Sequence, residues 1–402
     1  MNEALRTIGR ATIEELETTR GILASGKEEI YGCIFGRDSL ITALKLLSAH
    51  TRNPDPYLLV LVKKILTSLV ELQGTELNIE SGEEPGKIIH EYREDNHAHL
   101  TQQLERPWYV YADGTMRIYD SVDSTPLFLI AVARYWSVSS DEEFKEQIAP
   151  NIEAALGWVR ESIKADSRGF LTYQLPAERT HGGLATQSWM DSSESVFHED
   201  GSPTPYPIAP VEAQAYAYQA LRLWSISSEA SVLKERFNRA FVRQEPEFSI
   251  AFALDGNGVP MHSLRSSIGH LLWAAEGGDS ILETRLIPKL VTLLMSPDLF
   301  EPNAGIRTLA KSSSKFDPNS YHNGSIWPHD TAIAGEGLAA FGYTLEADAV
   351  RESLLRSWTH FNTPIELFVY TDEQGHTEYV GANGQRACMK QAWSAASILA
   401  EL

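Results

Sequence analysis

One stretch of the sequence, Gln187–Tyr218, combines an aromatic ring with a carboxylic acid in a way that suits sugar chemistry. Trp189 and Asp191 lie in a segment rich in glycine, serine and proline, and Glu212 and Gln214 follow on the first turns of an expected helix. An indole ring packs on a pyranose and desolvates a neighbouring acid, which raises its pKa until it can protonate a leaving oxygen. A core tryptophan beside a helix-capping aspartate explains the same residues equally well.

The composition favours an acidic cytoplasmic enzyme. The chain has 402 residues, 43% of them hydrophobic, and a formal net charge of -20. This charge argues against nucleic acid or an anionic membrane as a partner, because either would require a basic surface. No apolar run has membrane-spanning length, and the N-terminus has no apolar signal core. Cys33 and Cys388 are the two cysteines, and we expect them to be free thiols in a reducing compartment.

Helical periodicity dominates the chain, and no convincing ladder of strands is visible. Twelve segments have the pattern of a helix. In chain order they are Glu3–Ala24, Asp38–Ala49, Pro56–Gln73, Ser124–Trp136, Glu142–Lys164, Pro210–Trp224, Ser228–Val242, Ser266–Ala275, Ser280–Met295, Pro328–Phe341, Leu345–Thr359 and Cys388–Leu402.

The links between these segments alternate in length, and this alternation predicts the fold. Links after the even-numbered helices are short, as in Thr51–Asp55, whereas those after the odd-numbered helices are long, as in Gly74–Asp123. Short links join antiparallel neighbours, so all the long links would lie at one end. The sequence therefore predicts an all-α (α/α)6 barrel, a single catalytic domain over residues 1–402. An α-solenoid of six helical pairs is the alternative, although no motif repeats at a fixed period.

The polar motifs lie on the side of the long links, just before or at the start of the even-numbered helices. Six helix N-termini would therefore surround one pocket, and their free N–H groups suit the binding of hydroxyls and carboxylates. The motifs are Phe35-Gly36-Arg37-Asp38-Ser39, Asp120-Ser121-Val122-Asp123-Ser124, the stretch around Asp191, Asn323-Gly324-Ser325-Ile326-Trp327-Pro328-His329-Asp330, and Gln391-Ala392-Trp393.

These motifs resemble those of the six-hairpin glycoside hydrolases. The likeness is greatest to the glucosidase domain of bacterial and archaeal glycogen-debranching enzymes (amylo-α-1,6-glucosidases), and weaker to glucoamylases and trehalases. It extends from about Gly32 to the C-terminus. The blocks that carry it are FGRDSLITAL, EEPGKIIHEYR, DSVDSTPLFL, WMDSSES, PIAPVEAQAYAYQAL, IGHLLW, AGIRTLA, YHNGSIWPHDTAIAGEGLA, PIELF and QAWSAAS.

The resemblance implies an inverting mechanism with two carboxylic acids. Asp191, in the Trp-x-Asp block, would be the general acid, and Glu366, in a short Glu-aromatic motif, would be the general base. An inverting pair lies roughly 6.5–9.5 Å apart, which leaves room for a water molecule. Asp330, Glu212 and Glu378 compete for the role of base.

The same resemblance suggests which residues bind the substrate. Arg37 and Asp38 would bind the hydroxyls of the sugar at the cleaved end, because arginine can donate to two oxygens at once. Trp189 and Trp327 would stack on the sugar. The full set of expected substrate-binding or supporting residues is Phe35, Arg37, Asp38, Asp123, Trp189, Glu212, Gln214, Trp327, His329, Asp330 and Trp393.

The sequence predicts neither a cofactor nor a metal site, since His97-Ala98-His99 offers too few ligands. Debranching enzymes usually carry a β-rich domain before the barrel, and here the first motif begins at Phe35, so we expect no N-terminal β domain. The expected activity is exo-cleavage of a small α-glucoside, with linkage α-1,6 or another. The alternatives are a hydrolase of sucrose or of mannosyl- or glucosylglycerate, and a non-catalytic sugar-binding barrel.

Overall fold

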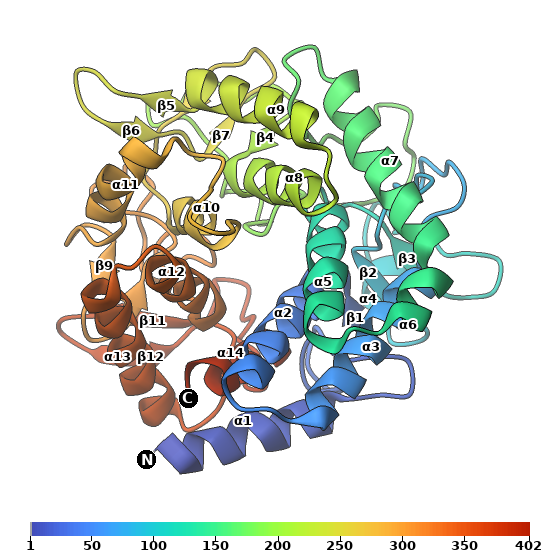
Figure 1. Ribbon diagram of the computed structural model, residues 1–402, viewed down its shortest axis with the longest axis horizontal. Helices are drawn as coiled ribbons and strands as arrows, with labels where there is room; N and C mark the ends of the chain where they lie inside the picture. The colour runs from blue at the N-terminus through green and yellow to red at the C-terminus, as the bar shows by residue number, and fades with distance from the viewer. Residues whose placement is uncertain (1) are drawn as a thin grey trace.

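The computed structural model describes residues 2–402 and is mostly helical (Figure 1). Six helices form an inner ring, in which each contacts the next and the last contacts the first. An outer helix packs against five of them, and against the 3-10 turn Ser266–Gly269 that leads into the sixth, α10 (His270–Trp273). The inner helices are α2 (Gly36–Arg52), α5 (Ser124–Ser139), α8 (Val211–Leu223), α10 (His270–Trp273), α12 (Pro328–Ala340) and α14 (Ala392–Glu401). The outer helices are α1 (Asn2–Leu16), α3 (Pro56–Glu71), α6 (Glu142–Gln147) with α7 (Ala149–Ala165), α9 (Ser227–Ala240), α11 (Ile287–Leu294) and α13 (Thr344–Phe361).

The burial patterns explain why each helix takes its layer. Helix α11 is amphipathic, because its buried residues Ile287, Leu290, Val291 and Leu294 follow helical spacing. Helix α12 is buried on nearly every side, as expected for a helix enclosed by neighbours. Its Gly337 allows close packing, since a Cβ at this position would lie 2.6 Å from the side chain of Leu272 on α10.

All twelve predicted segments contain helix, but several boundaries differ from the prediction. The first helix ends at Leu16 instead of Ala24, because the Thr18 hydroxyl accepts hydrogen bonds from the amides of Arg20 and Gly21 and forms a turn. The segment Glu142–Lys164 is two helices, α6 and α7, with Pro150 in the first turn of α7. The segments around α10 and α11 begin with 3-10 turns, Ser266–Gly269 and Thr284–Leu286.

No ladder of strands was visible in the sequence, but the structure contains short strands. The long links contain strands of two to four residues, which are too short for alternation to appear in the sequence. All are antiparallel, in the orders β1-β2-β3, β4-β7-β8, β5-β6, β9-β10 and β11-β12. The strands are β1 (Ile34–Phe35), β2 (Glu91–Arg93), β3 (Met116–Ile118), β4 (Ala209–Pro210), β5 (Val242–Arg243), β6 (Ser249–Ile250), β7 (Ala253–Leu254), β8 (Pro260–Met261), β9 (Phe300–Glu301), β10 (Gly305–Ile306), β11 (Phe368–Thr371) and β12 (Gly375–Glu378).

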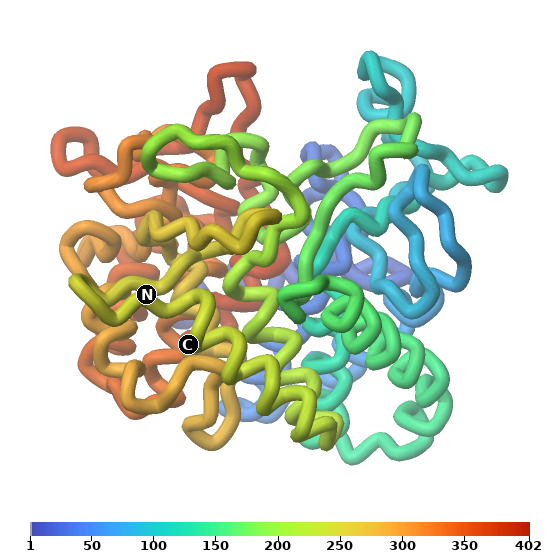
Figure 2. The backbone as a smooth tube through the Cα atoms, turned by 90° about the horizontal axis from the view of Figure 1, so that it is seen from above, coloured from blue at the N-terminus to red at the C-terminus, as the bar shows by residue number. Residues whose placement is uncertain are grey.

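The long links gather on one side of the helices, which Figure 2 shows from above. They include the short helix α4 (Ala98–Thr101). The N-terminal helix α1 packs against α14, so the two ends of the chain lie side by side (Figure 1). Within residues 2–402, no helix is both long and apolar enough to span a membrane.

Candidate active site

A narrow cavity on the side of the long links brings together most of the residues predicted from the sequence. Its volume is about 50 Å³. The side chains that surround it come from segments far apart in the chain. They are Tyr31, Phe35, Arg37, Asp38, His90, Trp189, Asp191, Tyr321, His322, Trp327, Glu366, Gln391 and Trp393. Asp191 and Glu366, the predicted acid and base, therefore line the same cavity.

Asp191 lies on a loop between Trp189 and α8 and retains contact with solvent. Its side chain is 28% exposed, and the guanidinium of Arg37 donates to its Oδ2 at 3.2 Å. Burial raises the pKa of Asp191 to about 6, although the positive charge of Arg37 partly offsets this effect. A carboxyl group with this pKa still holds its proton near neutral pH in a useful fraction of molecules, which general acid catalysis requires.

Glu366 lies on the link that leads into β11 and is almost fully buried, with 1% of its surface exposed. The hydroxyl of Tyr321 donates to its Oε1, and the backbone N–H of Cys388 donates to its Oε2 at 2.7 Å. Burial raises the pKa of Glu366 to about 7, against the lowering effect of these two donors. The carboxyl group is thus held in a fixed orientation with a pKa close to neutral.

Arg37 and Asp38 enter the cavity from the first turn of α2. Arg37 is fixed by Asp123, whose Oδ2 accepts from its Nε at 2.8 Å. Asp38 accepts a hydrogen bond of 3.1 Å from Gln391, and burial raises its pKa to about 8. Gly36 permits this entry, because a Cβ there would lie 1.9 Å from the carbonyl oxygen of Ile89.

Aromatic rings form one wall of the cavity. Trp189 lies edge-to-face with Trp327, with 5.6 Å between ring centroids, and Trp327 lies at 6.1 Å from Trp393. His329 does not line the cavity but stacks on Trp393 at 3.7 Å. Aromatic faces provide the apolar surface on which a sugar ring packs.

Several buried polar atoms of the lining have no hydrogen-bond partner among residues 2–402. Buried polar groups in native structures are almost always satisfied, so each exception calls for an explanation. A ligand rich in hydroxyl groups would supply both donors and acceptors to such atoms. They are Arg37 Nη2, His90 Nδ1, Trp189 Nε1, Trp393 Nε1 and Gln391 Oε1.

The structure places five predicted residues outside the lining. Asp123 holds Arg37, and His329 lies against Trp393. Asp330 contacts His270 at 2.7 Å. Gln214 bonds the backbone of Leu171 and Pro210, and Glu212 lies in a separate, smaller cavity. None of these side chains lines the cavity, but Asp123 and His329 contact residues that do.

Four lining residues were not among the predicted site residues but belong to the sequence blocks described above. Tyr321 and His322 open the block that contains Trp327, His90 lies in EEPGKIIHEYR, and Gln391 precedes Trp393. Because they lie in these blocks, they could have been included among the predicted site residues. Tyr31 lies before the first block, and no sequence signal identified it.

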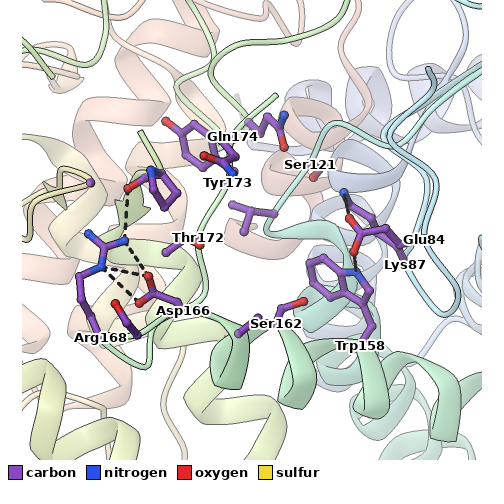
Figure 3. A pocket seen from close by; sticks show the side chains of 16 residues that line it. Glu84, Lys87, Ser121, Trp158, Ser162, Asp166, Arg168, Thr172, Tyr173 and Gln174 are labelled. Atoms are coloured by element: carbon purple, nitrogen blue, oxygen red, sulfur yellow. Dashed lines mark hydrogen bonds and ion pairs between the residues drawn. The ribbon is translucent and has the colours of Figure 1, made fainter. Parts of the chain in front are cut away.

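A larger cavity lies elsewhere on the molecule, with a volume of about 470 Å³ (Figure 3). It contains none of the predicted site residues, and its charged groups satisfy one another. Arg168 pairs with Asp166 at 3.0 Å, and Lys87 pairs with Glu84 at 2.9 Å. Among residues 2–402, no group of three or more His, Cys, Asp or Glu side chains is arranged to hold a metal ion.

Comparison with known proteins identifies the family of the chain. The sequence model of the amylo-alpha-1,6-glucosidase family matches residues 68–268, half of the chain. The chain belongs to this family of glycoside hydrolases. The model of the mannosylglycerate hydrolase MGH1-like glycoside hydrolase domain matches residues 223–366. No curated protein matches the sequence.

Solved structures of glycosidases share the fold. One is a GH63 mannosylglycerate hydrolase from Thermus thermophilus in complex with Tris, with 14% sequence identity, a TM-score of 0.66, and coverage of 98% of this chain and 99% of that chain. The same enzyme in complex with glucose has 13% identity, a TM-score of 0.66 and the same coverage. A glycosidase variant in complex with glucose has 13% identity, a TM-score of 0.58, and coverage of 100% and 96%.

Proposed function

We propose that this glycoside hydrolase is an inverting, exo-acting α-glycosidase that cleaves α-glucosidic linkages, α-1,6 or another, in small substrates. Asp191 acts as the general acid and protonates the glycosidic oxygen. Glu366 acts as the general base and removes a proton from the water that attacks the opposite face of the sugar. Two carboxyl groups divided in this way are the usual machinery of inverting glycosidases.

The observation that carries this proposal is the shared cavity of Asp191 and Glu366. Both carboxyl groups have pKa values raised by burial, to about 6 and about 7. Such values are suited to proton transfer near neutral pH. The aromatic wall and the unsatisfied polar atoms beside them match the apolar faces and hydroxyl groups of a sugar.

We further infer that the ring of contacting inner helices is an (α/α)6 barrel formed by a single catalytic domain. The predicted alternation of short and long links supports this assignment, as do the contacts of each inner helix with the next. In this arrangement the cavity lies beside the N-termini of three inner helices, α2, α12 and α14. The sugar at the end of the substrate enters this cavity, and the leaving group remains towards the loops.

A hydrolase of mannosylglycerate or a similar glycerate glycoside is the second candidate, because the matched domain model and a similar structure both carry that name. The charges around the cavity favour a neutral substrate. Arg37 is the only lysine or arginine of the described lining, and its contacts go to Asp123 and Asp191. Burial lowers the pKa of His90 and His322 well below the usual value, so neither offers a positive charge to a carboxylate.

Proton NMR of the protein with a panel of glycosides tests the proposal. The panel contains isomaltose, panose, maltose, trehalose, kojibiose, sucrose, glucosylglycerate and mannosylglycerate. We expect cleavage of a neutral α-glucoside with β-glucose as the first product. Release of α-glucose first would exclude inversion, and cleavage of only the glycerate glycosides would select the second candidate. Cleavage of none of them would contradict both.

A further inference from the structure

Arg265, which no motif singled out, is the most enclosed arginine near the candidate active site. It lies directly before the turn Ser266–Gly269, and only 1% of its surface is exposed. Its guanidinium carbon lies 5.2 Å from the ring centroid of Phe197 and 4.8 Å from that of Phe252. Burial lowers the pKa of Arg265 to about 9, so the guanidinium is still charged near neutral pH and its buried donors need partners. Nε has none within residues 2–402, and the contacts of Arg265 come from Nη1 and Nη2.

The donors of Arg265 join two loops of the active site. Nη2 donates to the carbonyl of Ser195 at 2.6 Å and to Oδ1 of Asn323 at 2.8 Å. Nη1 donates to the carbonyl of His322 at 2.9 Å and contacts the sulfur of Met190 at 3.4 Å. Ser195 and Met190 bound the segment Met190–Ser195, here called the acid loop, which carries Asp191.

The second loop, Tyr321–Asn323, is linked to the proposed base. The hydroxyl of Tyr321 donates a hydrogen bond to Oε1 of Glu366. Around Arg265, Asn323 Nδ2 donates to the carbonyl of Glu194 at 3.0 Å, and His322 Nδ1 lies 2.9 Å from the hydroxyl of Ser192. The acid loop and the loop that orients Glu366 are therefore joined at a single buried junction, with Arg265 at its centre.

The two loops depend on this junction to different degrees. The loop Tyr321–Asn323 has independent anchors, because Arg307 donates to the carbonyl of Gly324 at 3.0 Å and Trp327 Nε1 donates to the carbonyl of Tyr321 at 2.9 Å. For the acid loop, all hydrogen bonds that leave it within the described chain go to Arg265, His322, Asn323 or, from Asp191 itself, to Arg37.

We propose that Arg265 is a positioning residue that holds the acid loop against Tyr321–Asn323 and so places Asp191 relative to Glu366. This inference rests on the proposed function. Without the arginine, the loop of Tyr321 keeps its other anchors, whereas the acid loop loses its central one. A displacement of about 1 Å in a reacting group is enough to cost roughly 10²-fold in rate.

Arg265→Lys tests this proposal, with Arg307→Lys as the matched control. Arg307 is also buried, lies 5.4 Å from the ring centroid of Phe316 and makes three hydrogen bonds, but none of them reaches the acid loop. Each variant is assayed with the cleaved glycoside and with the corresponding glycosyl fluoride, whose leaving group departs without a proton. We expect Arg265→Lys to lower kcat/KM for the glycoside about 10²-fold and to change the fluoride reaction far less. Arg307→Lys should affect both substrates equally, because both require the base.

Hydrogen exchange of the amides of Ser192–Ser195 gives a second measurement that does not depend on activity. We expect faster exchange in Arg265→Lys than in Arg307→Lys. Equal losses on both substrates, or acid-loop exchange equal to that of the control, would overturn the role of Arg265. If Arg265→Lys does not fold, Asn323→Ala removes a neighbouring bond of the same junction and should show the same selectivity between substrates, more weakly. Failure of the proposed function is distinguishable, since the unmodified protein would then cleave neither substrate while exchange still reports on Arg265.

Discussion

The active-site cavity and the cavity of Figure 3 contain similar kinds of residues, but their carboxyl groups differ in how they are paired. In the cavity of Figure 3, burial alone would raise the pKa of Glu84, but Lys87 and Trp158 outweigh this effect and the pKa is lowered. In the active-site cavity, burial dominates, and the pKa values of Asp38, Asp191 and Glu366 are all raised.

This difference in pairing suggests different roles for the two cavities, one in stabilising the fold and the other in proton transfer. Paired groups stabilise the fold and leave little capacity for a ligand, whereas buried groups held near neutral pKa exchange protons readily. The larger volume belongs to the paired cavity. The raised pKa values, and not the volume, therefore single out the candidate active site, and substitutions in the two cavities should differ in their effect on turnover.

The largest effect is expected from the two proposed catalytic carboxyl groups. Asp191→Asn should lower kcat for a glycoside by about 10²–10⁴-fold, because it removes proton donation to the leaving oxygen. It should retain activity on a glycosyl fluoride, which needs no acid. Glu366→Gln should lose activity on both substrates, because both require an activated water.

Steady-state kinetics of the two variants with the two substrates measures this pattern. Circular dichroism establishes that each variant is folded. If Asp191→Asn lost the fluoride reaction and Glu366→Gln kept it, the acid and base assignments would have to be exchanged. Full activity of either variant on the glycoside would remove that residue from the mechanism.

A smaller effect is expected from Tyr321→Phe. The proposed mechanism needs Asp191 protonated and Glu366 deprotonated. Their pKa values are about 6 and about 7, so kcat/KM should peak between these two pH values. The Tyr321 hydroxyl lowers the pKa of Glu366, and its loss should raise that pKa. The alkaline limb of the profile then moves to higher pH by about one unit, and the maximum falls about tenfold, because fewer molecules have lost the proton of Glu366.

Tyr379→Phe is the matched control for this measurement. The ring of Tyr379 packs near that of Tyr321, with 5.4 Å between centroids, but its hydroxyl makes no hydrogen bond to Glu366 within residues 2–402. Its pH profile should match that of the unmodified protein. An unmoved alkaline limb in Tyr321→Phe, or one moved to lower pH, would contradict the role given to the Tyr321 hydroxyl.

The sequence predicted the fold well because each inner and outer helix carries its own local pattern. The alternation of short and long links was visible in the same way, and it placed the polar motifs on one side. The early end of α1 depends on one hydroxyl group, that of Thr18. The 3-10 turns before α10 and α11 are likewise local features of a few residues. Such local competition leaves no periodic signal.

The candidate site was harder to predict because the direction of each side chain depends on neighbouring segments. Arg37 and His329 occupy equivalent positions in the first turns of α2 and α12. Arg37 lines the cavity, whereas His329 stacks behind Trp393. The packing between helices decides which of the two residues faces the cavity. The hydrogen bond between Tyr321 and Glu366 also depends on packing, because the two residues are far apart in the chain.

Glu212 lies outside the lining of the active-site cavity, and we expect it to affect the free energy of unfolding instead of turnover. Burial, with a contribution from Asp123, raises its pKa from 4.5 to about 8. The folded protein therefore keeps a proton that the unfolded chain releases, and this stabilisation is complete below about pH 4.5 and lost as pH rises through about 8. The contribution of Glu212 to the free energy of unfolding changes with pH by at most about 1.4 kcal/mol per pH unit.

Glu212→Gln cannot titrate, so its free energy of unfolding should decline less between about pH 5 and about pH 8 than that of the unmodified protein. Denaturant unfolding at several pH values measures the two curves. Asp38, Asp191 and Glu366 contribute slopes of the same sign to both proteins, and the difference between the curves isolates Glu212. Parallel curves would show that Glu212 titrates normally.

The smallest effect is expected from Glu84→Gln in the cavity of Figure 3. The Glu84 side chain is 42% exposed, and its contacts with Lys87 and Trp158 lie at 2.9 Å and 3.0 Å. A pair this exposed contributes about 0–1 kcal/mol, so the free energy of unfolding should fall by no more than that. Turnover should not change, because the charges of this cavity satisfy one another and leave no group poised for proton transfer. Kinetics and denaturant unfolding of Glu84→Gln measured beside Glu366→Gln check both parts, and a large loss of turnover in Glu84→Gln would mean that the paired cavity takes part in the reaction.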